Sequence, residues 1–543
     1  MTFILGISGY FHDSSICLLK DGEFVEFLKE EEFTRIKGSK GFPVRALKYL
    51  INEYALTHET VDLVVFYEKP LKGWTTRTTQ SLRTPKKSFK LLSHQLKEFW
   101  NGPLGFASKL QKILKISEDK IKYAPHHFSH ALSALTFVEK DIAGKPMLHF
   151  VFDGVGDDNC QSIIFTHSTN ASVLFEEKFP NSLGLFYSTI TDFCGFLVNE
   201  GEYKLMGLAA FGKPIYADFM LQNILRHSGH RIRLDLAWFD FTHTPERSFS
   251  DKFISKFGQP ISFKKVRTVE DEDFVRAANL AKSAQVVVET VIQSLVEWGM
   301  NKYECASITI TGGVAQNSLA MGSLIRHLPP HIAVTIPPSP GDSGAAIGAA
   351  HFGKVLASNQ LLHTNKLYFG GQPQPSHFNI LDTMFERVSA PNEMDIIIDE
   401  LLIGGEIICT FFSGKEIGPR ALCNRSIICS ANNVSAVNKL NSKIKKREFF
   451  RPLAPVMLPE TAEQFFHLSE NSKKNYLWMA LTAKAKDNFP PQYSAALHAD
   501  KTARIQILDN KDHYIFKTLV RLKDKVDILI NTSFNVSGDP IVH

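Results

Sequence analysis

The sequence predicts a mixed α/β protein with at least two domains. Three observations lead to this prediction: the length, the glycine turns that follow apolar strand-like runs, and a glycine- and proline-rich break near residue 370. The chain has 543 residues, more than one ordinary hydrophobic core accommodates. Its 44% hydrophobic and 22% charged residues are typical of a soluble globular protein. We therefore place a first domain at residues 1–365 and a second at residues 375–543.

Charge and cysteine content argue against several classes of protein. The formal net charge of +5 is too small to indicate nucleic-acid binding by itself. The seven cysteines include no CxxC pair, which argues against a disulfide framework and against a cysteine zinc site. The opening MTFILGISGY lacks the basic segment of a signal peptide, and no apolar run approaches the length of a membrane span. We expect a cytoplasmic protein with no nucleic-acid or membrane partner.

The first domain is expected to alternate strands, glycine turns and helices. FILGISG predicts a strand and a turn, and SICLLKDGEFVEFLKEEEF predicts two strands joined at Asp21-Gly22. PMLHFVFDGVGDDN and CQSIIFTH predict a second pair of strands. Residues 275–300 predict a helix, and CASITITGGVAQNSLAMGSLI predicts a strand, a Gly312-Gly313 turn and a helix. This order suits an α/β fold with ligand loops at the strand ends.

A composition shift over residues 352–378 is typical of a domain boundary. It contains Gly370-Gly371, Pro373 and Pro375. Beyond it, EIICTFFSG, SIICSA and VDILINTSFN predict the strands of a second α/β domain.

Three of the glycine turns carry acidic or amide residues. Each turn alone is typical of a hairpin, because glycine lets the backbone turn tightly and approach a phosphate. Together they resemble the split nucleotide site of the two-lobed actin-like ATPase (ASKHA) fold. The turns contain Gly6, Gly9, Gly154, Gly156, Gly312 and Gly313, accompanied by Asp13, Asp153, Asp157 and Asn317. The resemblance implies nucleotide contacts at Gly154, Gly156, Gly312, Gly313, Val314 and Asn317.

The segment HHFSH places His126 and His130 four residues apart, on one face of a helix, while His127 points elsewhere. An HxxxH pair alone is more often a hydrogen-bonded helix start than a pair of metal ligands. Two carboxylates complete a ligand set: Asp153 ends a strand, and Asp342 opens a helix in PPSPGDSGAAIGAA. Two imidazoles and two carboxylates suit Fe(II), Mn(II) or Zn(II).

HHFSH, FDGVGD, TGGVAQN and PGDSG, in this order, resemble the O-carbamoyltransferases of antibiotic and nodulation-factor biosynthesis. The first domain of that family is related to the tRNA threonylcarbamoyl transferase subunit. The resemblance implies a metal, usually iron, held by His126, His130, Asp153 and Asp342.

Two further stretches add to this resemblance. GISGYFHDSSICLLKDG is similar to the family's N-terminal signature, which implies that His12, Asp13 and Lys37 lie near the acceptor. Gly38-Ser39 replaces the family's usual His-Asp, so this chain departs from the family at the acceptor loop. EGEYKLMGLAAFG implies that Lys204 faces the transferred group or a nucleotide phosphate; a lysine extending from a buried turn is an equal interpretation.

The second domain is rich in basic residues next to turns. GPRALCNRSII, NSKIKKREFFRPLAP, HADKTARIQIL and INTSFNVSGDP resemble a YrdC-like domain related to the threonylcarbamoyl-adenylate synthases. Arginine forks suit phosphate oxygens. The resemblance implies that carbamoyl phosphate and ATP bind at Arg420, Arg425, Lys445, Arg447, Arg451, Arg504, Asn531, Ser533 and Asn535. Cys423 stands where the family usually has glycine, which predicts strain if that position needs a positive φ. The sequence stops at GDPIVH, before the family's last helical segment, so we expect a C-terminal truncation.

The resemblance implies a two-step reaction. In the second domain, carbamoyl phosphate loses phosphate, and the carbamate attacks the α-phosphorus of Mg-ATP to give carbamoyladenylate and pyrophosphate. In the first domain, the carbamoyl group passes to a hydroxyl of a small molecule and AMP leaves. His12 is the candidate base, and a hydrogen-bonded turn residue is its equal alternative. The acceptor stays open among aminoglycosides, β-lactams, macrolides, oligosaccharides and other hydroxylated metabolites, and a homodimer is left open.

Two alternative functions remain at this stage. The first is threonylcarbamoyl transfer to tRNA, against which the modest charge and the fused second domain argue. The second is a non-catalytic actin-like nucleotide-binding switch, which would need neither the HxxxH pair with two aspartates nor a second phosphate site.

Overall fold

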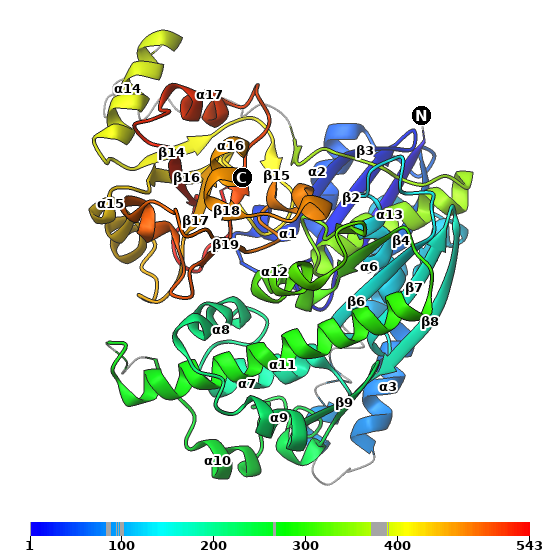
Figure 1. Ribbon diagram of the computed structural model, residues 1–543. Helices are drawn as coiled ribbons and strands as arrows, with labels where there is room; N and C mark the ends of the chain where they lie inside the picture. Colours follow the sequence, from blue (N-terminus) through cyan, green and yellow to red (C-terminus); the bar gives the residue numbers. More distant parts are fainter. Residues whose placement is uncertain are drawn as a thin grey trace. The chain divides into compact units, whose positions relative to one another are not determined.

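The computed structural model describes residues 2–82, 88–93, 95, 97, 102–263, 266, 268–370, 388 and 390–542. These residues form two compact units, the first ending at Asn365 and the second starting at Lys366 (Figure 1). The predicted boundary glycine Gly371 and the prolines Pro373 and Pro375 lie outside the described residues. Residues 352–358 continue a helix, so the composition shift begins before the division between the units.

Unit 1 contains two five-stranded sheets with the same strand order. The first sheet runs in the order β3 (Glu23–Lys29), β2 (Ser15–Lys20), β1 (Phe3–Ser8), β4 (Val61–Phe66), β5 (Ile121–Tyr123). The second sheet runs in the order β8 (Asn170–Lys178), β7 (Asn159–His167), β6 (Met147–Gly156), β11 (Ser307–Thr311), β12 (Ala333–Thr335). In each sheet the first three strands along the chain pair antiparallel, and the last two continue parallel to the first. The topology of unit 1 is therefore duplicated.

Helices and one small hairpin complete unit 1. They are α1 (Glu30–Thr34), α2 (Val44–Tyr54), α3 (Pro70–Leu82), α5 (Phe106–Leu114), α6 (His126–Leu135), α7 (Leu183–Phe193), α8 (Glu202–Leu208), α9 (Ala217–Asn223), β9 (Leu225–Ser228), β10 (Arg231–Leu234), α10 (Asp251–Phe257), α11 (Glu272–Lys302), α12 (Ser318–His327) and α13 (Asp342–Ser358). Helix α11 contains the predicted helix 275–300, which confirms that prediction. The strand predicted to run through EEEF ends earlier, at Lys29, and α1 follows it. There the Glu30 carboxylate accepts hydrogen bonds from the backbone N–H groups of Arg45 and Ala46, at the start of α2.

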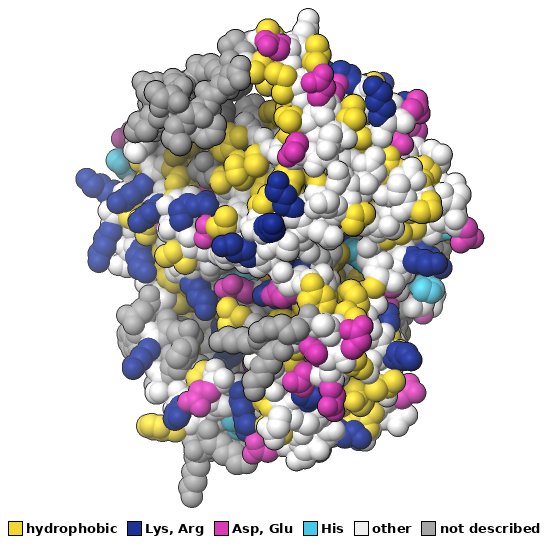
Figure 2. Space-filling model, turned by 90° about the vertical axis from the view of Figure 1, so that its left-hand side faces the viewer, with side chains coloured by type: hydrophobic (Ala, Val, Ile, Leu, Met, Phe, Trp, Pro, Cys, Tyr) yellow, Lys and Arg dark blue, Asp and Glu magenta, His cyan; other side chains and the backbone are white. Residues whose placement is uncertain are grey.

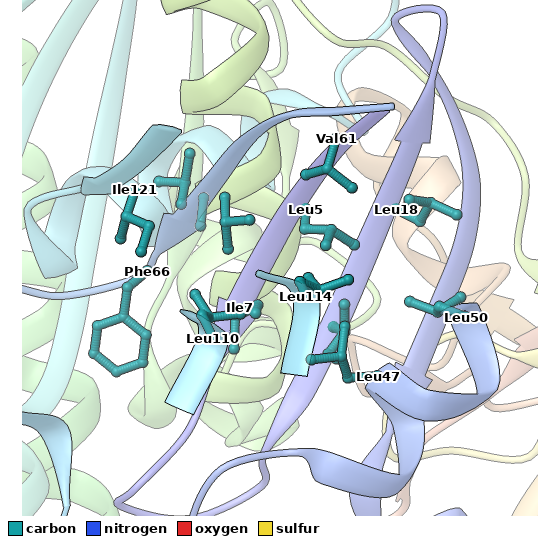
Figure 3. Close-up of a cluster of buried hydrophobic side chains, with 14 of the residues drawn as sticks. Leu5, Ile7, Leu18, Leu47, Leu50, Val61, Phe66, Leu110, Leu114 and Ile121 are labelled. Atoms are coloured by element: carbon teal, nitrogen blue, oxygen red, sulfur yellow. The ribbon is translucent and has the colours of Figure 1, made fainter. Parts of the chain in front are cut away.

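The first sheet buries one apolar face against helices α2 and α5 (Figure 3). Alternate residues of the strands point to this face, as the two-residue period of a strand requires. Side chains of β1, β2, β4 and β5 meet those of the two helices there: Leu5, Ile7, Leu18, Val61, Phe66 and Ile121 from the strands, and Leu47, Leu50, Leu110 and Leu114 from the helices. This core fixes the sheet whose strand ends lead to the candidate site.

Helix α13 packs closely on β1 and on α6 because small residues line it. A Cβ built on Gly6 would lie 2.0 Å from the carbonyl oxygen of Ala346, and one on Gly348 would lie 1.6 Å from that of Ser129. Neither position leaves space for a side chain. The small-residue segment after Asp342 thereby brings the start of α13 next to the histidine-bearing helix.

Unit 2 is a second mixed α/β unit, so the predicted α/β class holds for both halves. Its main sheet runs in the order β14 (Ile408–Phe411), β16 (Arg425–Ser430), β22 (Ile528–Ser533), β17 (Ala454–Met457), β21 (Gln506–Ile507). Smaller sheets pair β13 (Tyr368–Phe369) with β15 (Lys415–Glu416), and join β18 (Phe466–His467), β19 (Ala483–Ala485) and β20 (Thr502–Ala503). The helices are α14 (Pro391–Ile403), α15 (Val434–Lys439), α16 (Pro459–Phe465) and α17 (Tyr514–Arg521).

The surface carries both signs of charge. On the face drawn in Figure 2, acidic and hydrophobic side chains lie among the lysines and arginines. No helix in the described part of the chain combines the length and the apolar character that crossing a membrane requires.

Cys423 occupies a backbone conformation that favours glycine. Its φ is +81°, and its side chain is fully buried. A side chain in the left-handed region costs roughly 1–2 kcal/mol, so the departure from glycine noted in the sequence does carry strain.

We expect Cys423→Gly to be more stable than Cys423→Ala by about 1 kcal/mol, because both remove the thiol and only glycine relieves the strained φ. Cys429, buried in the regular strand β16, is the matched control. There glycine should be less stable than alanine by roughly 0.5–1 kcal/mol. Urea unfolding of the four variants measures both differences, and the same order at both positions would contradict the expectation.

Candidate functional site

Four buried side chains of unit 1 converge on one point. One ligand atom from each of His126, His130, Asp153 and Asp342 lies within 4.8 Å of all the others. Nε2 of His126 is 3.0 Å from Nε2 of His130 and 3.2 Å from a carboxylate oxygen of Asp153. Nε2 of His130 is 3.3 Å from a carboxylate oxygen of Asp342. Two imidazole nitrogens and two carboxylates at these separations fit a borderline-to-hard divalent cation such as Fe(II), Mn(II) or Zn(II).

The duplicated topology explains how distant segments reach this point. Helix α6 follows the last strand of the first sheet, and α13 follows the last strand of the second. Asp153 lies in β6, the central strand of the second sheet and its first along the chain. Asp342 is the first residue of α13. Because β6 continues to Gly156, Asp153 lies inside the strand, and the prediction that it ends the strand before a glycine turn is wrong. The other three candidate ligands lie in the first two turns of α6 and at the start of α13, at a position where ligand sites of α/β folds are common.

Backbone contacts orient the ligands. The N–H of Gly313 donates to one carboxylate oxygen of Asp153 at 3.1 Å, and the other oxygen faces His126. His127 turns away, as predicted, and its Nδ1 lies 2.6 Å from the hydroxyl of Ser162 on β7. The HHFSH segment thus places two of its three histidines in the cluster.

His12 and Asp13 lie beside the cluster, in the turn that follows β1. Nδ1 of His12 is 3.0 Å from Asp13, and its Nε2 is 3.6 Å from Asp342. Burial alone would lower the pKa of His12, but the carboxylates of Asp342 and Asp13 raise it to about 9. The two carboxylates therefore favour the protonated form of His12 when no cation is bound at Asp342.

The two predicted lysines of unit 1 lie against aromatic rings. Nζ of Lys37 is 5.6 Å from the ring centre of Tyr203, and Nζ of Lys204 is 5.7 Å from that of Phe196. Burial raises the pKa of Asp13, but the hydrogen bond with His12 and the charges of Lys29 and Lys37 bring it below the usual value. The positive charge of Lys37 therefore contributes to keeping Asp13 ionised.

Several predicted nucleotide residues have structural contacts of their own. Gly312 has a φ of +92°, and a Cβ there would lie 2.1 Å from the carbonyl oxygen of Phe152. Val314 lies in the short turn Gly313–Gln316. The side chain of Asn317 caps α12 by accepting from Ala320 N at 3.0 Å, and it pairs with Gln285. The carbonyl oxygen of Gly154 accepts from the hydroxyl of Ser182 at 2.6 Å.

Gly156 lies directly against the cluster of His126, His130, Asp153 and Asp342, which we call the metal-type cluster. A Cβ built there would lie 2.0 Å from Cδ2 of His126, so the imidazole ring packs directly on the glycine backbone. We expect Gly156→Ala to displace His126 and to weaken metal binding by at least about tenfold. Gly144→Ala is the matched control, because a Cβ at Gly144 meets nothing within 4 Å. Chelator competition on both variants measures the effect, and equal affinities would contradict it.

In unit 2, three predicted arginines form an electrostatic cluster. Burial and the nearby charge of Arg504 hold the pKa of Arg420 well below its usual value. Burial and the charge of Arg451 lower the pKa of Arg504 to about 10. Nε of Arg504 is buried and has no hydrogen-bond partner among the described residues. Arg451 pairs with Glu448 at 3.4 Å. Buried guanidinium groups near other arginines suit an anion, which would offset their positive charge.

The other predicted residues of unit 2 lie in hydrogen-bonded positions. Nζ of the buried Lys445 donates to the carbonyl oxygens of Ser533 and Asn535, both at 2.7 Å. Asn531 donates to the side chain of Gln506 at 2.7 Å. Arg425 stacks on the ring of Phe411 at 3.8 Å and donates to the carbonyl oxygen of Phe412. Arg447 is partly exposed, and its backbone N–H donates to Asn441.

Sequence reasoning missed one carboxylate next to the cluster. Glu68 lies two residues beyond the end of β4, and its carboxylate lies 3.7 Å from Nδ1 of His126. The signal that could have found it is positional, since an acidic residue just beyond an apolar parallel strand lies at the same edge of the sheet as His12 and Asp13.

Comparisons with known proteins agree along the whole chain. The family profile described as "Carbamoyltransferase N-terminus" matches residues 3–351, and the one described as "Carbamoyltransferase C-terminus" matches residues 399–543. The protein sll1178 of Synechocystis sp. is 33% identical, over 100% of this chain and 92% of its own length. Nodulation protein NolNO of Sinorhizobium fredii is 26% identical, over 98% of this chain and 75% of its own.

Solved structures are less similar. T. kodakarensis HypF is 13% identical, over 67% of this chain and 48% of that chain, with a TM-score of 0.34. That score is too low to assign the fold. Family membership does not depend on these structures, because the two family profiles match both parts of the chain in order. All four residues of the cluster lie within the N-terminal match. This protein belongs to the carbamoyltransferase family and is a carbamoyltransferase enzyme.

Proposed function

We propose that this protein is an ATP-dependent O-carbamoyltransferase. Unit 2 would convert carbamoyl phosphate and Mg-ATP into carbamoyladenylate and pyrophosphate. Unit 1 would transfer the carbamoyl group to a hydroxyl of a small molecule and release AMP. The family membership supplies the carbamoyl chemistry, and one structural observation supports the ATP-dependent route. This observation is that each unit has its own charged site, with a metal-type cluster in unit 1 and an arginine cluster in unit 2.

The two-lobed actin-like fold is our proposal for unit 1. Two sheets with identical strand order support it, because a two-lobed nucleotide fold places related halves on either side of a ligand. For unit 2 we propose the YrdC-like fold on the strength of its sequence motifs alone.

The residues of unit 1 suit transfer to a hydroxyl. When bound, the metal would supply Lewis acidity toward a carbamoyl or phosphate oxygen. His126, His130, Asp153 and Asp342 would hold it, and their burial keeps bulk water from the reactive anhydride. His12 lies 3.6 Å from the Asp342 carboxylate and 3.0 Å from that of Asp13, and would orient the acceptor hydroxyl. As a neutral imidazole it would also take the proton of that hydroxyl.

Unit 2 suits the first step because that step brings together the negatively charged phosphates of carbamoyl phosphate and ATP. Arg420, Arg451 and Arg504 would bind the phosphate oxygens of carbamoyl phosphate and ATP. Burial and neighbouring arginines lower the pKa values of Arg420 and Arg504, so a bound anion would offset the positive charge there.

The test requires no knowledge of the acceptor. The purified protein is mixed with carbamoyl phosphate and Mg-ATP, pyrophosphate is measured, and carbamoyladenylate is sought by mass spectrometry. We expect pyrophosphate that depends on carbamoyl phosphate. Nucleotide retained without turnover, in a folded and metal-loaded sample, would instead favour a nucleotide-binding switch. A product formed from threonine and bicarbonate, but not from carbamoyl phosphate, would favour the threonylcarbamoyl alternative.

A further inference from the structure

Glu68 lies at the edge of the metal-type cluster, on the side of His126 away from the other ligands. Nε2 of His126 faces His130 and Asp153, whereas Nδ1 faces Glu68 at 3.7 Å. Nδ1 is buried and has no hydrogen-bond partner among the described residues. Leaving a buried polar atom unpaired costs about 1–3 kcal/mol. The Glu68 carboxylate is the charged acceptor placed to pair with it, at a separation about 0.5 Å beyond hydrogen-bond range.

The backbone around Glu68 is tied to helix α6 on both sides. The hydroxyl of Ser129 on α6 donates to the carbonyl oxygen of Tyr67 at 2.9 Å. The two carboxylate oxygens of Asp157 accept from Lys69 N at 2.7 Å and from His126 N at 3.0 Å. Glu68 lies between these two attachments. These hydrogen bonds hold the backbone on either side of Glu68 in a fixed position relative to α6.

We propose that Glu68 is a positioning residue for His126. Its carboxylate would accept a hydrogen bond from Nδ1–H, which keeps the proton on Nδ1 and leaves the Nε2 lone pair free to bind a metal ion. Such a carboxylate also holds the ring plane and makes the imidazole a stronger ligand. This inference rests on the proposed metal site, and concerns one residue that the motifs of the sequence do not contain.

The test is metal affinity, measured apart from activity. Zn²⁺ binding to the metal-stripped full-length chain is followed by competition with a chromogenic chelator for the wild type, Glu68→Gln, Glu68→Leu and His130→Gln. We expect about tenfold weaker binding for Glu68→Gln, which keeps an acceptor oxygen, and about 100-fold weaker binding for Glu68→Leu. Glu26→Gln is the matched control, since Glu26 is a buried glutamate of the same sheet whose carboxylate accepts from Phe27 N. We expect its affinity to equal that of the wild type.

The outcomes separate the two ideas. If the wild type binds Zn²⁺ no more tightly than His130→Gln, the proposed metal site fails. If the wild type binds tightly and Glu68→Gln binds equally tightly, the metal site stands and the role of Glu68 is overturned. Thermal unfolding of the metal-free proteins accompanies each measurement. A purely structural role would lower the Tm of Glu68→Gln and leave the affinity of the folded protein unchanged, which also contradicts the proposal.

The absorption spectrum of bound Co²⁺ provides a second readout. Its visible bands depend on ligand geometry, and we expect them to shift in Glu68→Gln and to stay unchanged in Glu26→Gln. Because Glu68→Gln is nearly isosteric, it keeps the test decisive even if Glu68→Leu does not fold.

Discussion

Replacing His130 with glutamine should remove the metal from unit 1 and leave the first chemical step intact. His130 is fully buried, and its Nε2 contacts both His126 and Asp342. Loss of an outer-shell partner typically weakens metal binding by about 10–100-fold. Loss of a direct ligand should therefore weaken it by at least about 100-fold. Pyrophosphate release from carbamoyl phosphate and ATP should continue, since the residues proposed for that step lie in unit 2.

His149→Gln is the matched control. His149 is also a fully buried histidine of unit 1, but its two ring nitrogens pair with the hydroxyls of Thr309 and Thr166. We expect a change in thermal stability and full metal content. Elemental analysis after gel filtration measures metal per chain, and a pyrophosphate assay measures the first step. Equal metal content in His130→Gln and the wild type would refute the ligand assignment.

The candidate ligands were predictable because an HxxxH pair, an aspartate in a buried strand and an aspartate that opens a helix are each visible in a few letters. That these four residues form one set was implied by the family resemblance, and the structure brings them together. The strands around the glycines were also predictable, since β1, β6 and β11 are short segments rich in β-branched and aromatic residues, with glycine near or just beyond their carboxyl end. These features depend on neighbours in the chain, and so a single sequence contains them.

The duplication of the sheets was not predictable in the same way. It depends on which strands pair, for example Ile308 with Leu148 in β11 and β6. Strand pairing of this kind joins residues far apart in sequence and leaves no local signal. The position of Glu68 just beyond β4 is visible in the sequence, but its proximity to His126 depends on the same long-range packing.

Turn residues also have more than one use, and the sequence does not distinguish them. Asn317 follows the GG turn as a nucleotide residue would, yet its side chain caps α12 and pairs with Gln285. A helix N-cap and a ligand contact both favour asparagine at such a position.

Replacing Arg504 with methionine should weaken the first step and stabilise the free protein. The pKa of Arg504, about 10, is lowered by burial and by Arg451. A cationic group whose pKa is lower in the folded than in the unfolded chain opposes folding at every pH below its folded pKa. Removing it should therefore raise the Tm at neutral pH in a buffer without phosphate. The same change should reduce pyrophosphate formation about 10- to 100-fold, because a hydrogen bond to a charged group contributes about 1.5–3 kcal/mol.

The direction of the Tm change, together with the loss of pyrophosphate formation, distinguishes an anion-binding arginine from a structural one. Replacing an arginine that has a structural role lowers the stability of the protein. Replacing an arginine that lies among like charges in an anion site raises the stability of the free protein. Added pyrophosphate should raise the Tm of the wild type by mass action, and the rise should be smaller in Arg504→Met. Arg521→Met is the matched control, because Arg521 at the end of α17 pairs with Asp399 of α14 at 2.8 Å. Loss of this arginine should lower the Tm and leave the pyrophosphate response unchanged. If Arg504→Met behaves like Arg521→Met, the cluster of Arg420, Arg451 and Arg504 is not the anion site, and the first step must bind its phosphates elsewhere.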